Sequence, residues 1–276
     1  MENNSHRTYR GKLKAIIFDW AGTTLDYGCL APTIAVMNLF EQEGVKITIE
    51  EARKPMGAYK KDHIRQILNM PSVRSRWQQK YGKPPLEQDV ERMFNNFIPV
   101  QTECLPKYAD LIPGTLETVS NCRMRGMKIG TTTGYTQSMM AILLAEANRR
   151  GYSPDTTVCS DQVRAGRPEP WMCYQNAINL GLYPMEAFVK VDDTPTGIAE
   201  GLNAGMWTIG VAKTGNELGL SQTEIEKLSQ NDLQEKLEKA YQRLYQAGAH
   251  YVVDGIWDIP KIIDQIQEKL KLGEKP

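Results

Sequence analysis

Short apolar runs alternate with longer stretches of helical spacing from residue 113 to the end of the chain, and one further run stands near its start. Apolar runs rich in β-branched residues are typical of strands buried in a sheet, and the longer stretches are typical of amphipathic helices. Strands are predicted at residues 15–18, 127–132, 156–159, 187–191, 206–211 and 250–254. Helices are predicted at residues 115–125, 136–149, 170–180, 196–204, 222–247 and 258–271. This alternation predicts right-handed βαβ crossovers and a parallel sheet with helices on both faces.

The segment between the first two predicted strands has helical spacing and no strand pattern. Residues 31–43 carry apolar side chains at this spacing. Residues 48–51 (Thr-Ile-Glu-Glu) have the form of a capping box, in which the first and last residues cap each other's backbone N–H groups. Further helices are predicted, after a break at Pro-Met-Gly, at residues 60–70, 71–81 and 87–105.

These patterns divide the chain into two domains. We predict an α/β core of residues 1–28 and 106–276, built on a doubly wound, Rossmann-like parallel sheet. An all-helical cap of residues 29–105 is inserted after the first strand. The length of 276 residues suits one domain with a smaller insert, and 41% hydrophobic with 24% charged residues is ordinary for a soluble protein.

Charge and hydropathy exclude several classes of partner. Lys plus Arg and Asp plus Glu number 33 each, so no net charge favours nucleic acid or an anionic membrane. There is no apolar run of about 18 residues, the minimum for a membrane span. Residues 1–11 are polar and lack the apolar centre of a signal peptide. We expect a cytoplasmic protein with no nucleic-acid or membrane partner.

The cysteines do not form a pattern of metal ligands or disulfides. Their number is odd, and their spacing does not match that of zinc ligands. Most are expected to be small buried residues, and Cys29, just beyond the first strand, is interpreted as structural too. The five are Cys29, Cys104, Cys122, Cys159 and Cys173.

The first predicted strand ends at an acid. Asp19 directly follows the apolar residues 15–18, and Gly22 supplies a flexible turn. Because ligands bind at the carboxyl ends of parallel strands, Asp19 is predicted to stand on a rigid element in an active site. An acid that merely ends a strand is the alternative.

Residues 15–24 resemble the first motif of the haloacid dehalogenase superfamily, an apolar strand followed by Asp-x-x-Gly-Thr. Most phosphatases and mutases of that superfamily carry a second acid two places after the first, which protonates the departing alcohol. This chain has Ala21 there, and a methyl group cannot donate a proton. The form Asp-Trp-Ala-Gly-Thr resembles that of the phosphonatase family, which hydrolyses phosphonoacetaldehyde. The resemblance covers essentially the whole chain, and a helical cap is one of the superfamily's layouts.

The resemblance implies a nucleophile and a magnesium site. Asp19 would attack phosphorus and form an aspartyl-phosphate, while Mg²⁺ would relieve the crowding of negative charge. The implied metal ligands are Asp19, the backbone carbonyl of Ala21, and Asp193. Many relatives carry a further acid where this chain has Gly197, and Asp192 is a candidate to compensate. A helix N-cap pair is the alternative for Asp192 and Asp193.

Two further motifs imply groups that bind the phosphoryl oxygens. Residues 131–133 (Thr-Thr-Thr) match the second motif, and the resemblance selects Thr133 with the backbone of Gly134. The amino end of the next predicted helix also favours an anion. Residues 165–171 match the third motif, with Arg167 in place of the usual lysine. A guanidinium can bind two oxygens at once, whereas a surface arginine in a proline-rich loop is the alternative.

Lys60 is predicted to activate the carbon fragment. Cleavage of a carbon–phosphorus bond expels a carbanion, and a protonated imine would draw those electrons away as an enamine. Residues 51–63 resemble the phosphonatase lysine segment, which aligns Lys60 with the Schiff-base residue. A free lysine has a pKa of about 10.4, so a drop of about three units is needed. Burial under a closed cap, with cations such as Arg53 or Lys54 nearby, would supply it.

Two more cap residues are assigned to this site. His63, one helical turn after Lys60, is expected to shuttle protons. Met56 is expected to pack beside the imine, with a core methionine as the alternative. If the match to the lysine segment is set aside, Lys60 and Lys61 form an ordinary solvated helix face.

The resemblance implies hydrolysis of phosphonoacetaldehyde, a small-molecule phosphonate, to acetaldehyde and phosphate. A phosphatase of the same superfamily is one alternative. A 2-haloacid dehalogenase is another, and it would need neither Mg²⁺ nor a cap lysine. A regulatory protein that has kept the fold is the non-enzymatic alternative. Because relatives are homodimers, the resemblance also implies a homodimer.

Overall fold

Strand β1 (Ala15–Phe18) lies in the interior of a six-stranded sheet whose order is β3-β2-β1-β4-β5-β6. The computed structural model describes residues 8–276. Most of residues 1–11, the polar segment that is not expected to be a signal peptide, therefore lies outside the described residues. Every pair of neighbouring strands is parallel, as predicted. The other strands are β2 (Lys128–Thr133), β3 (Thr156–Cys159), β4 (Phe188–Asp192), β5 (Trp207–Val211) and β6 (Tyr251–Val253).

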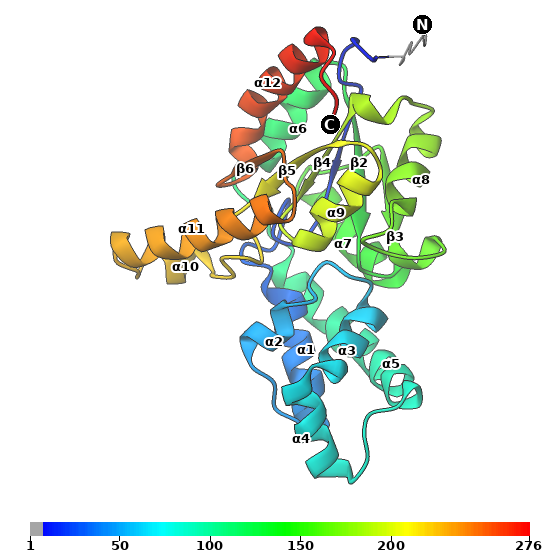
Figure 1. Cartoon of the computed structure of the whole chain (residues 1–276), viewed down its shortest axis with the longest axis vertical. Coiled ribbons are helices and arrows are strands. Elements are labelled where there is room, and N and C mark those ends of the chain that lie inside the picture. The colour runs from blue at the N-terminus through cyan, green and yellow to red at the C-terminus, as the bar shows by residue number, and fades with distance from the viewer. Residues whose placement is uncertain (1–7) are drawn as a thin grey trace, which may run out of the picture.

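Helices cover both faces of this sheet (Figure 1). The helices of the core are α6 (Thr115–Met124), α7 (Gln137–Arg149), α8 (Trp171–Leu180), α9 (Pro195–Asn203), α10 (Gln222–Ile225), α11 (Gln230–Gln246) and α12 (Ile259–Leu272). Of these, α10 has no buried residue and projects away from the sheet with α11. Ile16 and Phe18 of β1 pack in one apolar cluster with side chains of α6 and α12, whereas Ile17 packs in another with α8. Successive strand residues point to opposite faces, which explains the two clusters. The predicted doubly wound α/β core is confirmed.

The helical structure predicted over residues 222–247 is confirmed, but it is interrupted. The chain there forms two helices, α10 and α11, with a break between them. Ser229 is the N-cap of α11, and its hydroxyl oxygen accepts the backbone N–H of Asp232 at 3.1 Å. A serine side chain can replace the missing helical partner of such an N–H, so it favours a helix start over a helix interior.

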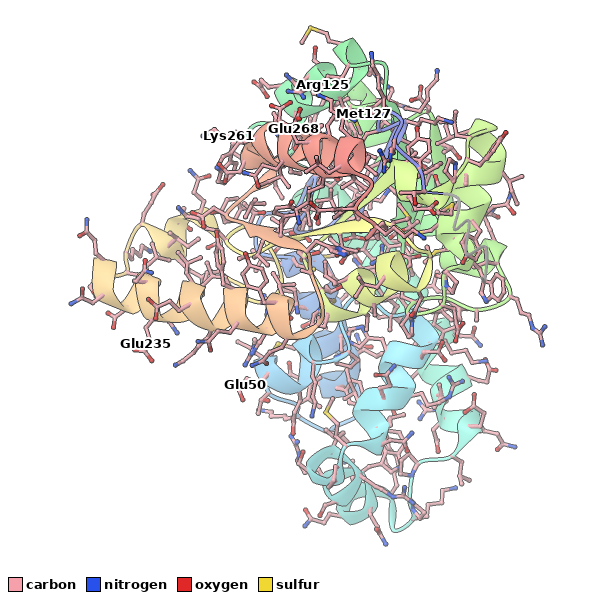
Figure 2. The ribbon with its side chains drawn as sticks, turned by 45° about the horizontal axis from the view of Figure 1, so that its top comes forward. Glu50, Arg125, Met127, Glu235, Lys261 and Glu268 are labelled. Atoms are coloured by element: carbon pink, nitrogen blue, oxygen red, sulfur yellow. The ribbon has the colours of Figure 1, made fainter. Side chains whose placement is uncertain are left out.

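The outer helices keep their charged side chains in solvent. Lys261 and Glu268 on α12 and Glu235 on α11 are exposed (Figure 2), whereas Ile263 and Ile266 of α12 are buried. This is the pattern of an amphipathic helix that packs with one side only. None of the helices in residues 8–276 combines the length and the apolar composition that crossing a bilayer requires.

The inserted segment forms a helical layer beyond the sheet, below it in Figure 1. Its helices are α1 (Leu30–Gln42), α2 (Ile49–Arg53), α3 (Lys60–Asn69), α4 (Pro71–Tyr81) and α5 (Glu87–Cys104). The predicted capping box is confirmed, because Thr48 Oγ1 accepts the N–H of Glu51 at 3.1 Å and Glu51 Oε2 accepts the N–H of Thr48 at 2.9 Å. Buried cap side chains such as Trp77 join the same apolar cluster as Phe18 of β1. The domain boundaries at residues 28/29 and 105/106 stay a prediction.

Candidate active site

Three neighbouring strands bring polar side chains to one edge of the sheet. Asp19 follows β1, Thr133 ends β2, and Asp193 follows β4. The backbone N–H of Asp19 donates to Val191 O at 2.9 Å, so the acid is still held by the sheet. Because this is the carboxyl end of parallel strands, it is where a ligand is expected to bind.

A pocket lies between this edge of the sheet and the cap. All but one of the residues predicted for the site line it, and the exception is His63. The lining residues from the predicted core are Asp19, Ala21, Thr133, Gly134, Tyr135, Arg167, Asp193 and Thr194. Those from the predicted cap are Cys29, Pro32, Met56, Gly57 and Lys60.

Lys60 is buried at the first turn of α3, with 4% of its surface exposed. Its Nζ lies 3.8 Å from the sulfur of Met56 and 5.0 Å from the centre of the Tyr135 ring. Burial is the main cause that lowers the pKa of Lys60 from 10.5 to about 8. The charge of Arg167 acts in the same direction, whereas Cys29, Asp19 and Asp193 oppose it. The cation that lowers this pKa is therefore Arg167, and not Arg53 or Lys54 as expected.

His63 lies away from the pocket lining. Its ring is fully buried, and Nε2 lies 2.8 Å from the carbonyl oxygen of Ala52. Because a carbonyl can only accept, Nε2 carries the hydrogen and Nδ1 has a lone pair. Burial lowers the pKa of His63 to about 3, and the charge of Lys60 contributes, so the ring is neutral. Its predicted role as a proton shuttle stays a prediction.

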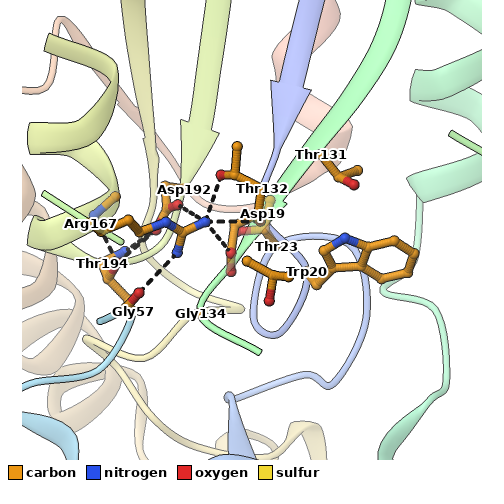
Figure 3. Close-up of polar contacts among 12 residues, drawn as sticks. Asp19, Trp20, Thr23, Gly57, Thr131, Thr132, Gly134, Arg167, Asp192 and Thr194 are labelled. Atoms are coloured by element: carbon orange, nitrogen blue, oxygen red, sulfur yellow. Dashed lines mark hydrogen bonds and ion pairs between the residues drawn. The ribbon is translucent and has the colours of Figure 1, made fainter. Parts of the chain in front are cut away.

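Arg167 is a buried side chain at the base of the pocket, not a surface arginine. Its Nη2 donates to Asp19 Oδ1 at 2.6 Å and to the carbonyl oxygen of Thr132 at 2.9 Å (Figure 3). On its other side, Nε donates to Glu200 Oε2 at 2.9 Å. A planar guanidinium held from two directions has a fixed orientation toward the carboxylate of Asp19.

Lys190 and Glu200 belong to the same buried network, and sequence reasoning missed them. Lys190 Nζ lies 2.7 Å from Asp192 Oδ2 and 3.4 Å from Glu200 Oε2, and all three side chains are fully buried. Burial acts to raise the pKa of Asp192, but Arg167 and Lys190 hold it below its ordinary value. The sequence signal that could have identified them is a charge at an apolar position. Lys190 stands inside an apolar strand, and Glu200 stands on the apolar face of a helix.

Within residues 8–276 no ion pair is formed by Asp193, and Asp19 shares its cation, Arg167, with Asp192. Oxygen atoms of Asp19, Asp192 and Asp193 lie within 4.8 Å of one another. Burial raises the pKa of Asp193 well above its ordinary value, and the charges of the other two raise it further. Burial also raises the pKa of Asp19, although Arg167 opposes this. Close carboxylates of this kind fit a hard divalent cation such as Mg²⁺, which would let both stay ionised.

Gly197 leaves the space that the carboxylate of Asp192 fills. A Cβ atom at position 197 would lie only 1.9 Å from Asp192 Cγ. Asp192 Oδ1 accepts the N–H of Thr194 at 3.0 Å and its hydroxyl at 2.7 Å. An acid at position 192 and a side chain at position 197 therefore exclude each other in this arrangement. This contact explains why position 197 carries no acid in this chain, whereas the predicted compensation by Asp192 stays a prediction.

The second motif forms one wall of the pocket. Thr133 Oγ1 accepts the N–H of Tyr135 at 3.1 Å, which leaves its own O–H to donate. The amino end of α7 is partly occupied, because the N–H of Gln137 donates to both carboxylate oxygens of Asp161 at 3.1 Å. Tyr135 also lines the pocket, although the sequence motifs did not select it. Its position two residues after Thr133 is the signal that could have identified it.

The Pro-Met-Gly break closes the pocket from the cap side. Thr196 Oγ1 donates to the carbonyl oxygen of Met56 at 2.8 Å. Gly57 has a φ of +86°, and a Cβ there would lie 2.4 Å from the hydroxyl oxygens of Thr194 and Thr196. Only glycine suits both this conformation and this close approach.

Cys29, interpreted as structural, lies in the pocket wall in a small apolar cluster with Ala21 and Met56.

Comparisons with known proteins agree on one family. Residues 13–205 match the family described as haloacid dehalogenase-like hydrolase. The chain is 47% identical over 271 residues to the phosphonoacetaldehyde hydrolase of Syntrophobacter fumaroxidans, with 98% of each chain covered. It is 48% identical over 258 residues to that of Bacillus cytotoxicus, with 94% of this chain and 98% of the other covered. The crystal structure of a phosphonoacetaldehyde hydrolase-like protein from Oleispira antarctica aligns with a TM-score of 0.96 and 42% identity, covering 98% of both.

Proposed function

Because the chain belongs to the phosphonoacetaldehyde hydrolase family of the haloacid dehalogenase-like hydrolases, we propose that it hydrolyses the carbon–phosphorus bond of phosphonoacetaldehyde. The substrate and one water give acetaldehyde and phosphate. The observation that carries the proposal is that a buried lysine, Lys60, and a buried carboxylate, Asp19, line the same pocket. A lysine provides imine chemistry and a carboxylate provides a nucleophile for phosphorus.

In the proposed reaction, Lys60 acts on the carbon half of the substrate. Its neutral amine attacks the aldehyde carbon, water leaves, and a protonated imine forms. When the carbon–phosphorus bond breaks, the electron pair enters the carbon–nitrogen system and gives an enamine. Protonation of the enamine carbon and hydrolysis of the imine release acetaldehyde and return Lys60. The amine is buried, and this burial favours its neutral form, as does the charge of Arg167.

Asp19 acts on the phosphorus half. Its carboxylate attacks phosphorus as the carbon–phosphorus bond breaks, and an aspartyl-phosphate forms. Water then releases phosphate and returns the carboxylate, so the reaction consumes one water overall. Arg167, already 2.6 Å from Asp19 Oδ1, neutralises charge beside the attacked group, and the Thr133 O–H donates to a phosphoryl oxygen.

A magnesium ion is part of the proposal. Asp19, Asp193 and the backbone carbonyl of Ala21 would hold it, and it would supply positive charge against the phosphonate oxygens. Asp192 pairs with Lys190 and Arg167 and is not among the ligands assigned here. The homodimer expected from the resemblance stays a prediction.

Phosphate release from phosphonoacetaldehyde is expected to exceed release from simple phosphate monoesters by several orders of magnitude. The reason is that Ala21 cannot protonate an alcohol leaving group, whereas Lys60 assists only an aldehyde. Initial rates with phosphonoacetaldehyde, phosphoglycolate and 2-chloropropionate, each with Mg²⁺ and with excess chelator, check this. Faster turnover of the monoester would support a phosphatase instead. Chloride release in chelator would support a dehalogenase.

The rate is expected to follow the neutral fraction of Lys60. With a pKa of about 8, about a tenth of the amine is neutral at pH 7, against under about 0.1% for an ordinary lysine. Because the amine must lose its proton to attack, kcat/KM should rise about tenfold from pH 6 to pH 7 and level off above pH 8. Measurements from pH 6 to pH 10 at fixed Mg²⁺ test this. A continued rise to pH 10 would contradict a lowered pKa.

A further inference from the structure

Arg53, the last residue of α2, reaches out of the cap and bonds to the core. Its Nη1 donates to Gly28 O at 3.0 Å and to Asn216 Oδ1 at 3.2 Å, and its Nη2 donates to Gly219 O at 3.0 Å. Asn216 Nδ2 donates back to the carbonyl oxygen of Arg53 at 3.4 Å. One cap side chain thus joins the point where the chain enters the cap to residues 212–220, the loop that follows β5.

That loop is shaped around the guanidinium. Gly219 has a φ of +67°, and a Cβ there would lie 2.6 Å from Arg53 Cζ. Gly28 has a φ of +88°, and its Cβ would lie 2.6 Å from Leu220 O. Both positions call for glycine because of conformation and space alike. Arg53 is therefore fitted into a site made of backbone carbonyls, and it is not a loose surface cation.

The same loop holds one of the three clustered acids from its other side. The backbone N–H of Asn216 donates to Asp193 Oδ2 at 2.7 Å. A Cβ at Gly215 would lie 2.3 Å from Asp193 Cβ, so the loop backbone packs directly on this acid. Asn216, with 4% of its surface exposed, thus presents its side chain to Arg53 and its backbone N–H to Asp193.

We propose that Arg53 is a latch that holds the cap closed, and that its bonds to Asn216 transmit closure to the carboxylate of Asp193. Arg53 does not line the pocket, so it acts as a positioning residue. Opening the cap breaks its bonds to Gly28, Asn216 and Gly219, and the loop behind Asp193 loses its outer support. Lys60 is buried by the same closure, so one contact orders both the lysine and the acid. The kinetic consequence, but not the latch itself, rests on the proposed function.

Arg53→Met tests the latch without any substrate. Amide hydrogen exchange of residues 54–60 and 212–220 is expected to become faster, because both segments lose their mutual contact. The Mg²⁺ dissociation constant, measured by calorimetry, is expected to rise about tenfold, which is a usual size for coupling between two sites. The matched control is Arg92→Met, because Arg92 bonds to Glu43 within the cap, with Nη2 at 2.9 Å from Oε2. The control should leave both quantities unchanged.

Two further variants keep the test decisive. Arg53→Lys keeps the charge but reaches fewer carbonyls, so its effect should be intermediate; it also carries the test if Arg53→Met does not fold. Adding Asn216→Ala to Arg53→Met should weaken Mg²⁺ binding little beyond the single change, because the two share one contact. With phosphonoacetaldehyde, Arg53→Met should raise KM more than it lowers kcat. Unchanged exchange and unchanged Mg²⁺ binding in Arg53→Met overturn the latch, whatever the substrate proves to be.

Discussion

Replacing Lys60 by arginine is expected to lower phosphate release from phosphonoacetaldehyde by about four orders of magnitude or more, the usual cost of removing a covalent catalyst. A guanidinium keeps the positive charge but has a pKa above about 12, so it offers no neutral amine to the aldehyde. The pocket therefore keeps its electrostatics and loses only the imine. Phosphate release measures the first effect, and intact mass after borohydride reduction measures the loss of the covalent adduct.

The matched control for this variant is Lys61→Arg. Lys61 is the next residue in α3, but it pairs with Glu91 on the cap surface, so arginine can take its place there. Wild-type rates and a normal borohydride adduct are expected for the control. If Lys60→Arg retains turnover, or if peptide mapping of the wild type places the adduct on Lys61, the imine has been assigned to the wrong lysine. Lys60→Met, which removes the charge as well, checks that crowding by arginine does not cause the loss.

Replacing Asp19 by asparagine is expected to abolish phosphate release to a similar extent while leaving imine formation intact. An amide does not attack phosphorus, so no aspartyl-phosphate forms. The aldehyde still meets Lys60, because that step uses the other half of the substrate. Borohydride should therefore trap an adduct in Asp19→Asn and none in Lys60→Arg. This difference separates the two halves of the proposed reaction.

A surface acid serves as the control for Asp19→Asn. Asp110 is exposed and pairs with Arg150 at 3.1 Å, so Asp110→Asn should change neither phosphate release nor trapping. Thermal unfolding checks that each variant is folded. Loss of the adduct in a folded Asp19→Asn would mean that the acid is also needed to form the imine. Turnover at the wild-type rate would remove Asp19 from the mechanism.

The sequence predicted the parts of this protein that depend on neighbours along the chain. Apolar runs indicated β1 and its parallel partners, and the Thr-Ile-Glu-Glu signal placed the start of α2 correctly. These features follow from side-chain periodicity and from hydrogen bonds over a few residues, and both depend only on residues close together in the sequence. The break before Ser229 is local too, because the serine hydroxyl accepts a backbone N–H at the start of α11.

The superfamily motifs selected most of the residues around the pocket, although their roles stay predictions. Asp19, Arg167 and Lys60 come from segments far apart in the chain, and the resemblance rather than periodicity joined them. The resemblance did not select Lys190 and Glu200, the buried charged residues that support this site. Nothing near Lys190 in the sequence indicates that its partner Glu200 lies across a helix–strand contact, 3.4 Å away.

Tertiary structure alone decided how these side chains are paired. Arg167 donates to Asp19 across 148 residues of sequence, Asp192 fills the space left by Gly197, and Arg53 bonds to the loop behind Asp193. Each of these contacts joins elements whose relative position is set by the packing of the sheet, its helices and the cap. The sequence by itself therefore determined the elements and the family, whereas burial and charge balance in the pocket exist only once distant segments are packed together.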